Sequence, residues 1–280
     1  MINPAEASFI QDHAHIPEHL PGYGSIMSGG EPFLVEDFVA YHGRGALVFI
    51  GYPLEEKINE DRLARTLTAT IQRLNPNQAV LIAPSIPSLE GTRGKADVYY
   101  RLDLTHVQIR SKVNNMILRA GREVKVEMGR SLGAEHERLI ADFLESSNLE
   151  EGSRFIFKKI PEYISSVSTA EIFSARDASG NIAAFDIADF GSKQYVFYMF
   201  NFRSRVRIIP GVSDLLIHAL IQEAKAQGKI AVNMGLGINE GVAFFKKKWG
   251  ACPFLNHESL CLPAKRPSFF ESIFQGLIKG

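Results

Sequence analysis

Residues 170 to 236 carry the pattern that most constrains the fold of this chain. Three runs rich in apolar and aromatic residues, AEIFSARD, NIAAFDIAD and QYVFYMFNF, are separated by turns of the kind that joins antiparallel neighbours, DASGN and FGSK. An amphipathic helix, VSDLLIHALIQEAKAQ, then ends at Gly228 and is followed by the short strand KIAVNM. Three antiparallel strands, a helix and a further strand predict an α/β (α+β) layer built on a mixed sheet.

The first half of the chain has a similar coarse order of elements. Residues 33 to 52 alternate and end in ALVFIGY, which predicts two strands around the turn HGRG. An amphipathic helix over residues 55 to 75 and the apolar strand AVLIAPSI follow. The first 30 or so residues are rich in His, Pro and Gly, and we expect an irregular lead-in there. The shared order leaves an internal duplication open.

Composition limits the classes of partner. The 280 residues are 45% hydrophobic, which is enough for one large domain or two ordinary ones. Lys plus Arg and Asp plus Glu number 31 each, so an anionic partner must be met locally. Cys252 and Cys261 lack metal-ligand spacing and are interpreted as reduced thiols, with no metal site. Neither a signal peptide nor an apolar run of about 18 residues is visible, which predicts a cytoplasmic protein without a transmembrane segment.

Two other segments allow more than one interpretation. Residues 105 to 130 carry many cations and just two acidic side chains, Glu123 and Glu127. The preferred interpretation is a solvated helix, RSKVNNMILRAG, followed by the strand EVKVEMG; the alternative is a cationic patch for a phosphate or carboxylate. The tail RPSFFESIFQGLIKG is interpreted as packing on the protein, and the alternative is a short amphipathic helix at a membrane surface.

The stretch NMGLGINEGVAFFKKKWGA predicts a strand, a glycine turn and a short helix. Gly235 and Gly237 permit the turn, and Asn239 can cap the helix. Phe245 and Trp249 then share one apolar face. Because ligands of open α/β sheets collect at the carboxyl ends of strands, the turn is a candidate binding site.

Three successive lysines lie on this helix, and they cannot all point the same way. Lys246, beside Phe245, is expected nearest the buried edge, and Lys247 and Lys248 are expected to face water. A wholly solvated face remains the alternative for the triplet.

These residues resemble the acyltransferase part of the GNAT superfamily, in particular its Fem-type, aminoacyl-transferring branch. Common GNAT chains place an Asn after the fifth strand and a Gly eleven residues on, with a catalytic Tyr between, and Asn239 and Gly250 are similar to the ends of that frame. The Tyr position falls on Lys246. Fem-like relatives carry Phe-Lys before an aromatic-Gly pair, which is similar to Phe245, Lys246, Trp249 and Gly250. The resemblance covers residues 105 to 262 well and the first hundred in outline.

The resemblance implies two GNAT-like halves, each a mixed, mostly antiparallel sheet flanked by helices. We expect a divergent N-terminal domain over residues 1–120 and an acyltransferase domain over residues 121–280. The strands KIAVNM and YVFYMFNF should diverge near Gly235. The resemblance also implies that the backbone of Asp186 to Asp189 helps to hold the acyl group, that Lys246 stabilises an oxyanion, and that Asp186 and Asp189 orient the amine.

One departure concerns coenzyme A. GNAT members that use it carry a glycine-rich loop before the long helix, whereas this chain has RSRVRIIPGVSD. Gly211 fits the loop, but Ile208 stands three residues before it and Pro210 removes an amide donor. Arg203, Arg205 and Arg207 alternate, and in an extended segment they would share one side and could bind an anion. The alternative is that they are ordinary strand-edge charges.

The leading hypothesis is therefore an enzyme that moves an acyl or aminoacyl group from an activated carrier to an amine acceptor. The donor would be acyl-CoA or aminoacyl-tRNA, with tRNA a partner in the second case. The alternative is a GNAT-like ligand-binding module without transfer activity, since fold does not imply function. The missing pyrophosphate loop and Tyr favour the module, and the Phe245-Lys246 pair favours the enzyme.

Overall fold

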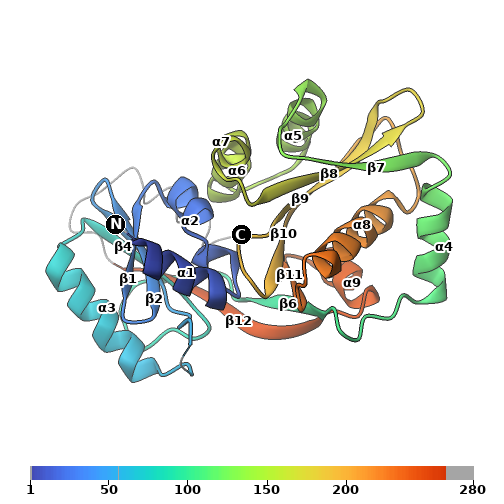
Figure 1. The fold of residues 1–280 in the computed structure, drawn as a ribbon. Coiled ribbons are helices and arrows are strands. Elements are labelled where there is room, and N and C mark those ends of the chain that lie inside the picture. The colour runs from blue at the N-terminus through green and yellow to red at the C-terminus, as the bar shows by residue number, and fades with distance from the viewer. Residues whose placement is uncertain (1, 56, 263–280) are drawn as a thin grey trace. The chain divides into compact units, whose positions relative to one another are not determined.

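The structure, a computed structural model, describes residues 2–55 and 57–262 (Figure 1). These residues form two compact units, neither of them continuous in sequence. The first unit holds residues up to 99 together with 149–159 and the described residues from 254 on; the second holds 100–148 and 160–253. The boundary at residue 120 stays a prediction, and residues 100–120 group with the second unit. The tail RPSFFESIFQGLIKG lies outside the described residues.

The first unit is built on a mixed sheet in the order β1-β2-β3-β4-β12, with β5 beside β12. Strands β1, β2 and β3 pair antiparallel, and β12 runs antiparallel to β4. Strands β3 and β4 are parallel neighbours, and helix α3 connects them along the chain. Helix α3 buries Leu63 and Leu67 in the core of this unit. The elements are α1 (Pro4–His13), η1 (Pro17–His19), α2 (Pro21–Ser28), β1 (Glu31–Val35), β2 (Phe38–Gly43), β3 (Ala46–Ile50), α3 (Glu60–Leu74), β4 (Gln78–Ala83), β5 (Thr92–Arg93), α6 (Glu151–Lys158) and most of β12 (Cys252–Cys261).

The second unit repeats this plan with the order β11-β10-β9-β8-β7. Strands β7 to β10 pair antiparallel in sequence, and α8 connects β10 to a parallel β11. Helix α8 packs on β8 and β9, and Phe185 of β9 contacts His136 of α5 from the other face. The elements are β6 (Asp97–Asp103), whose first residues belong to the first unit, α4 (Ser111–Ala120), β7 (Val124–Gly129), α5 (Ala134–Ser146), α7 (Ile160–Ser166), β8 (Ala170–Asp177), β9 (Ile182–Asp189), β10 (Tyr195–Arg203), α8 (Val212–Ala226), β11 (Ala231–Leu236) and α9 (Glu240–Lys248).

Each unit thus contains three consecutive antiparallel strands, β1–β3 or β8–β10, followed by a helix and a strand parallel to the third, and the second unit adds β7 at its edge. This arrangement confirms the predicted α/β fold with two similarly built halves. The sequence pattern located the helix and strand of each crossover because their hydrophobic periods differ, about 3.6 residues for the helix and 2 for the strand.

The expected irregular lead-in was wrong. Asn3 caps α1: its side chain accepts from the Glu6 backbone N–H at 2.9 Å, and the Glu6 side chain accepts from the Asn3 N–H at 2.8 Å. This capping box, with Pro4 in the first turn, was visible in the sequence NPAE and outweighed the breakers around it. His19 is fully buried and its Nε2 hydrogen-bonds the Tyr52 carbonyl at 2.9 Å.

Within the described residues, no helix is both long and apolar enough to cross a membrane.

Candidate functional site

The ladder between β10 and β11 is short, and this defines the candidate site in the second unit. The two strands pair at Tyr195–Ala231, Val196–Val232 and Phe197–Asn233, and β10 then continues to Arg203 while β11 continues to Leu236. A bulge between Tyr198 and Phe200 shifts the register of β10 against β9 at the same level. The ladder thus ends two residues before Gly235, as predicted for strands that diverge there, and a cleft between them stays a prediction.

Three groups meet where the strands diverge. Gly235 has a positive φ of 74°, and a Cβ added to it would lie 3.6 Å from the Tyr198 carbonyl oxygen and 3.7 Å from Lys246 Nζ. Asn233, which is fully buried, accepts the Gly235 N–H through Oδ1 at 2.8 Å. The glycine permits the turn and keeps side-chain atoms out of the space beside the carbonyl and the ammonium.

Lys246 is held rather than solvated. It projects from α9, whose first turn is capped as predicted: the Val242 N–H donates to Asn239 Oδ1 at 3.0 Å. Lys246 is 3% exposed, its Nζ donates to the Leu236 carbonyl, and it lies 5.8 Å from the centroid of the Tyr100 ring. The lysine nearest the buried edge is thus Lys246, as expected, and its ammonium is oriented before any ligand arrives.

The two neighbouring lysines behave differently from each other. Lys247 is exposed, as predicted. The expectation that Lys248 faces water was wrong, because its Nζ lies 2.6 Å from Oδ1 of the buried Asp214 at the start of α8. The same carboxyl accepts the Trp249 indole N–H at 3.0 Å. Trp249 is buried and Phe245 is half-buried, so Asp214 fixes the end of α9 against α8.

Asp186 is a fully buried carboxyl on β9. Its Oδ1 accepts from Asn201 Nδ2 at 2.5 Å and from the Tyr198 hydroxyl at 3.4 Å, while Oδ2 has no hydrogen-bond partner among the described residues. Burial raises the pKa of Asp186 to about 8, against the two hydrogen bonds, which lower it. The group is therefore mostly protonated at neutral pH. Half-buried Tyr198 connects it to the diverging strands.

Asp189 belongs to a different environment. Residues three apart on a strand face opposite sides of the sheet, so Asp189 points away from Asp186. It accepts from the Tyr163 hydroxyl of α7 and from the Gly191 N–H at 2.8 Å. Burial raises its pKa, and the bonds from Tyr163 and Thr169 oppose that shift. The structure therefore brings Asp186, and not Asp189, to the side of the sheet that carries α8.

The arginines before α8 do not share one side. The backbone bends at residues 205–207, and Arg207 pairs with Asp177 at 2.9 Å, so the expected extended segment was wrong. Arg203 and Arg205 are exposed and form no ion pair within the described chain. Gly211 has a φ of 84°, and a Cβ there would lie 2.4 Å from the Met116 carbonyl oxygen of α4. Close packing of α4 therefore requires this glycine.

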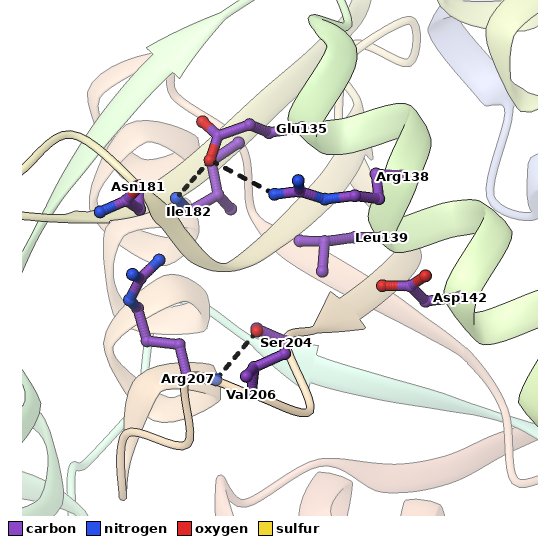
Figure 2. A pocket seen from close by; sticks show the side chains of 9 residues that line it. All are labelled: Glu135, Arg138, Leu139, Asp142, Asn181, Ile182, Ser204, Val206 and Arg207. Atoms are coloured by element: carbon purple, nitrogen blue, oxygen red, sulfur yellow. Dashed lines mark hydrogen bonds and ion pairs between the residues drawn. The ribbon is translucent and has the colours of Figure 1, made fainter.

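A hollow of about 450 Å³ lies beside α5, on the face of the sheet opposite α8 (Figure 2). Figure 2 shows Glu135 joined to Arg138 and to the Ile182 backbone, and Arg207 joined to Ser204. The charges there are largely paired within the protein: Glu135 also binds Arg176 at 2.9 Å. The lining residues are Glu135, Arg138, Leu139, Asp142, Asn181, Ile182, Ser204, Val206 and Arg207. Because Lys246 and Asp186 are not among them, this hollow is not the candidate site.

No group of three or more His, Cys, Asp or Glu side chains with metal-binding geometry occurs in residues 2–55 and 57–262.

Sequence reasoning missed Tyr198, Asn201 and Asn233. Their signal was present: two amides and the Tyr198 phenol stand inside the otherwise largely apolar strands YVFYMFNF and AVNM. Strand β11 lies between β6 and β10, and β9, which carries Asp186 and Asp189, is the next strand after β10; the acyl-holding role of the β9 backbone stays a prediction.

No protein-family model and no curated protein matches the sequence. Solved structures do match across most of the chain. The C-terminal domain of a putative lysylphosphatidylglycerol synthetase from Agrobacterium fabrum has a TM-score of 0.60 at 13% identity, covering 97% of this chain and 96% of that one. FemX has a TM-score of 0.59 at 9% identity, covering 92% and 96%. A GCN5-related N-acetyltransferase from Kribbella flavida has a TM-score of 0.52 at 12% identity, covering 90% and 95%.

The chain has a GNAT fold. FemX shares this fold over most of its length, which agrees with the predicted resemblance as far as the fold is concerned. In this GNAT fold, β10 and β11 are the parallel strands that diverge, and α9 supplies the lysine beside them.

Proposed function

We propose that the second unit transfers an acyl or aminoacyl group from an activated carrier to an amine acceptor. The observation that carries the proposal is the Lys246 ammonium, buried and oriented beside the Tyr198 carbonyl where β10 and β11 diverge. A preorganised cation in a site shielded from water stabilises developing negative charge far better than a solvated one.

In the proposed reaction, the amine nitrogen attacks the carbonyl carbon of an ester or thioester. A C–N bond forms, the carrier leaves with the electrons of the C–O or C–S bond, and the amine loses a proton. Lys246 stabilises the oxyanion of the tetrahedral intermediate. The proton lost by the amine is taken up by the oxygen or sulfur of the departing carrier. The Asp186 carboxyl, whose pKa of about 8 keeps it mostly protonated at neutral pH, accepts from the Tyr198 hydroxyl and holds that side chain in place on β10. Asp189 serves the packing of α7.

The donor is the finer part of the proposal. Pro210 has no N–H, and a buried Ile209 precedes it, so the start of α8 offers fewer backbone donors to a pyrophosphate than the usual loop. This favours an aminoacyl-tRNA over acyl-CoA, and tRNA is then a partner. Calorimetry with acetyl-CoA tests this choice, and tight binding would reverse it.

The rival function is a ligand-binding module without transfer activity. It draws support from the same interrupted loop and from the Leu236 carbonyl, which already accepts one of the N–H donors of Lys246. A module of this kind would bind its ligand but would form no product.

The test is Lys246→Met, which keeps the apolar stem of a buried lysine and removes the charge. Turnover with aminoacyl-tRNA or acyl-CoA and a panel of amines should fall by about 10²-fold or more, as for loss of one oxyanion donor. Lys247→Met is the matched control, because Lys247 is exposed and also lies near the Tyr100 ring, at 6.0 Å. Equal turnover in the two variants would contradict the proposed role. Lys248 is unsuitable as a control, because it pairs with Asp214.

A further inference from the structure

An exposed surface of the second unit combines aliphatic side chains with unpaired cations. Val206 is 95% exposed and Ile208 is 69% exposed, both in the loop that enters α8. On α4, Leu118 is 56% exposed. We call this surface the loop–α4 surface: residues 203–208 together with the exposed side of α4 and the turn after it. Single exposed apolar residues are ordinary, but three of them here stand among cations.

The cations of the loop–α4 surface lack acidic partners. Those of α4 and the following turn fall at spacings of seven and three residues, so they lie along one exposed side, and Leu118 lies about 100° round the helix from Arg119. None of them has an ion pair within the described chain. They are Lys112, Arg119, Arg122, Arg203 and Arg205. Since the chain as a whole has a formal charge of zero, this is a local concentration of positive charge.

The loop and the helix are held together. The Gly211 backbone packs so closely on Met116 that no side chain fits between them, and Figure 1 shows α4 beside α8. The loop itself is fixed: Arg207 pairs with Asp177, its N–H donates to Ser204 Oγ at 3.0 Å, and Ile209 is buried. Val206 and Ile208 are therefore presented outward by an anchored loop.

We propose that the loop–α4 surface docks on the surface of an anionic lipid bilayer. Cations next to such a surface each raise the association constant by about fivefold, and aliphatic side chains gain further by entering the boundary between headgroups and acyl chains. A nucleic acid meets the cations equally well but offers nothing to Val206, Ile208 and Leu118. Proteins that bind single strands place aromatic rings against the bases, and none of these three side chains is aromatic. The inference concerns where the protein works and does not depend on the proposed transfer reaction.

The test is sedimentation of the full chain with vesicles of phosphatidylcholine, with and without phosphatidylglycerol. We expect binding to the mixed vesicles that weakens as salt rises. Val206→Asp combined with Ile208→Asp should weaken binding by about tenfold or more, and Arg203→Gln combined with Arg205→Gln by a similar factor. Ile58→Asp is the matched control, because Ile58 is an exposed isoleucine (44%) in the first unit, and it should bind as the unaltered chain does.

Equal binding to both kinds of vesicle, or no effect of the Val206 and Ile208 changes, would overturn the proposal. Binding of an RNA duplex that depends on the arginines and is unaffected by the Val206 and Ile208 changes, together with no vesicle binding, would identify nucleic acid as the partner instead. All the altered side chains are exposed, so fluorescence of Trp249 should confirm that each variant is folded.

Discussion

The buried carboxyl of Asp186 makes stability depend on pH in a predictable direction. In the unfolded chain an Asp loses its proton near pH 3.8, whereas folded Asp186 keeps it until about pH 8. Between these values the folded state binds one more proton than the unfolded state. The free energy of unfolding must therefore fall as pH rises through this window, and level off above it. Asp186→Asn removes this dependence, because the amide cannot ionise.

The magnitude follows from the width of the window. Each pH unit costs about 1.4 kcal/mol, so the unaltered chain should lose roughly 4 kcal/mol against Asp186→Asn between pH 4 and pH 7. Asn keeps an acceptor for Asn201 Nδ2, so the hydrogen bond at Oδ1 is retained. Urea unfolding followed by fluorescence is a suitable assay. Trp249 is the single tryptophan of the chain and belongs to the same unit as Asp186.

The comparison is made between the two proteins at each pH, so that other titrating groups cancel. A difference in unfolding free energy that grows in favour of Asp186→Asn from pH 4 to pH 8 is the expected result. Parallel curves would refute the reasoning, because they would mean that Asp186 ionises in the folded protein as readily as in water. A solvent channel to the carboxyl would then have to exist.

Three further substitutions test the packing of the second unit, each by the urea midpoint of Trp249 fluorescence. Gly211→Ala should destabilise the unit by ~2 kcal/mol or more, because the new Cβ clashes with Met116 and the residue must keep a positive φ. Gly180→Ala is the control for the backbone cost alone, because Gly180 has a φ of 83° and no atom lies within 4 Å of the added Cβ. Asp214→Ala should cost about 3 kcal/mol and shift the Trp249 emission, because it leaves the indole N–H without its acceptor. Tyr163→Phe should cost about 1–3 kcal/mol by removing the hydroxyl donor to Asp189. An unchanged midpoint in any of the three would contradict the contact on which it rests.

Local signals predicted much of the fold. Features that depend on only a few neighbouring residues can be predicted from the sequence. They include the turns DASGN and FGSK, the cap at Asn239 and the end of the helix near Gly228. Long-range partners were less accessible. Lys248 faces Asp214, 34 residues earlier, and nothing in the periodicity of either helix indicates that pairing. The helical N-terminal segment was missed for a different reason: composition was weighed above the capping box at Asn3 and Glu6.

The order of elements along the chain also predicts which strand pairs with β11. A strand, a helix and a second strand in sequence form a right-handed crossover, and its two strands are commonly neighbours in the sheet. Residues 195–203, the helix 212–226 and residues 231–236 have this order, so β10 had to be the first candidate for the partner of β11. The Asp186 carboxyl is joined to β10 by its hydrogen bonds with Asn201 and Tyr198. The two predicted aspartates are three residues apart on β9 and therefore lie on opposite faces of the sheet: Asp186 is on the face that carries α8, and Asp189 is on the face that carries α7.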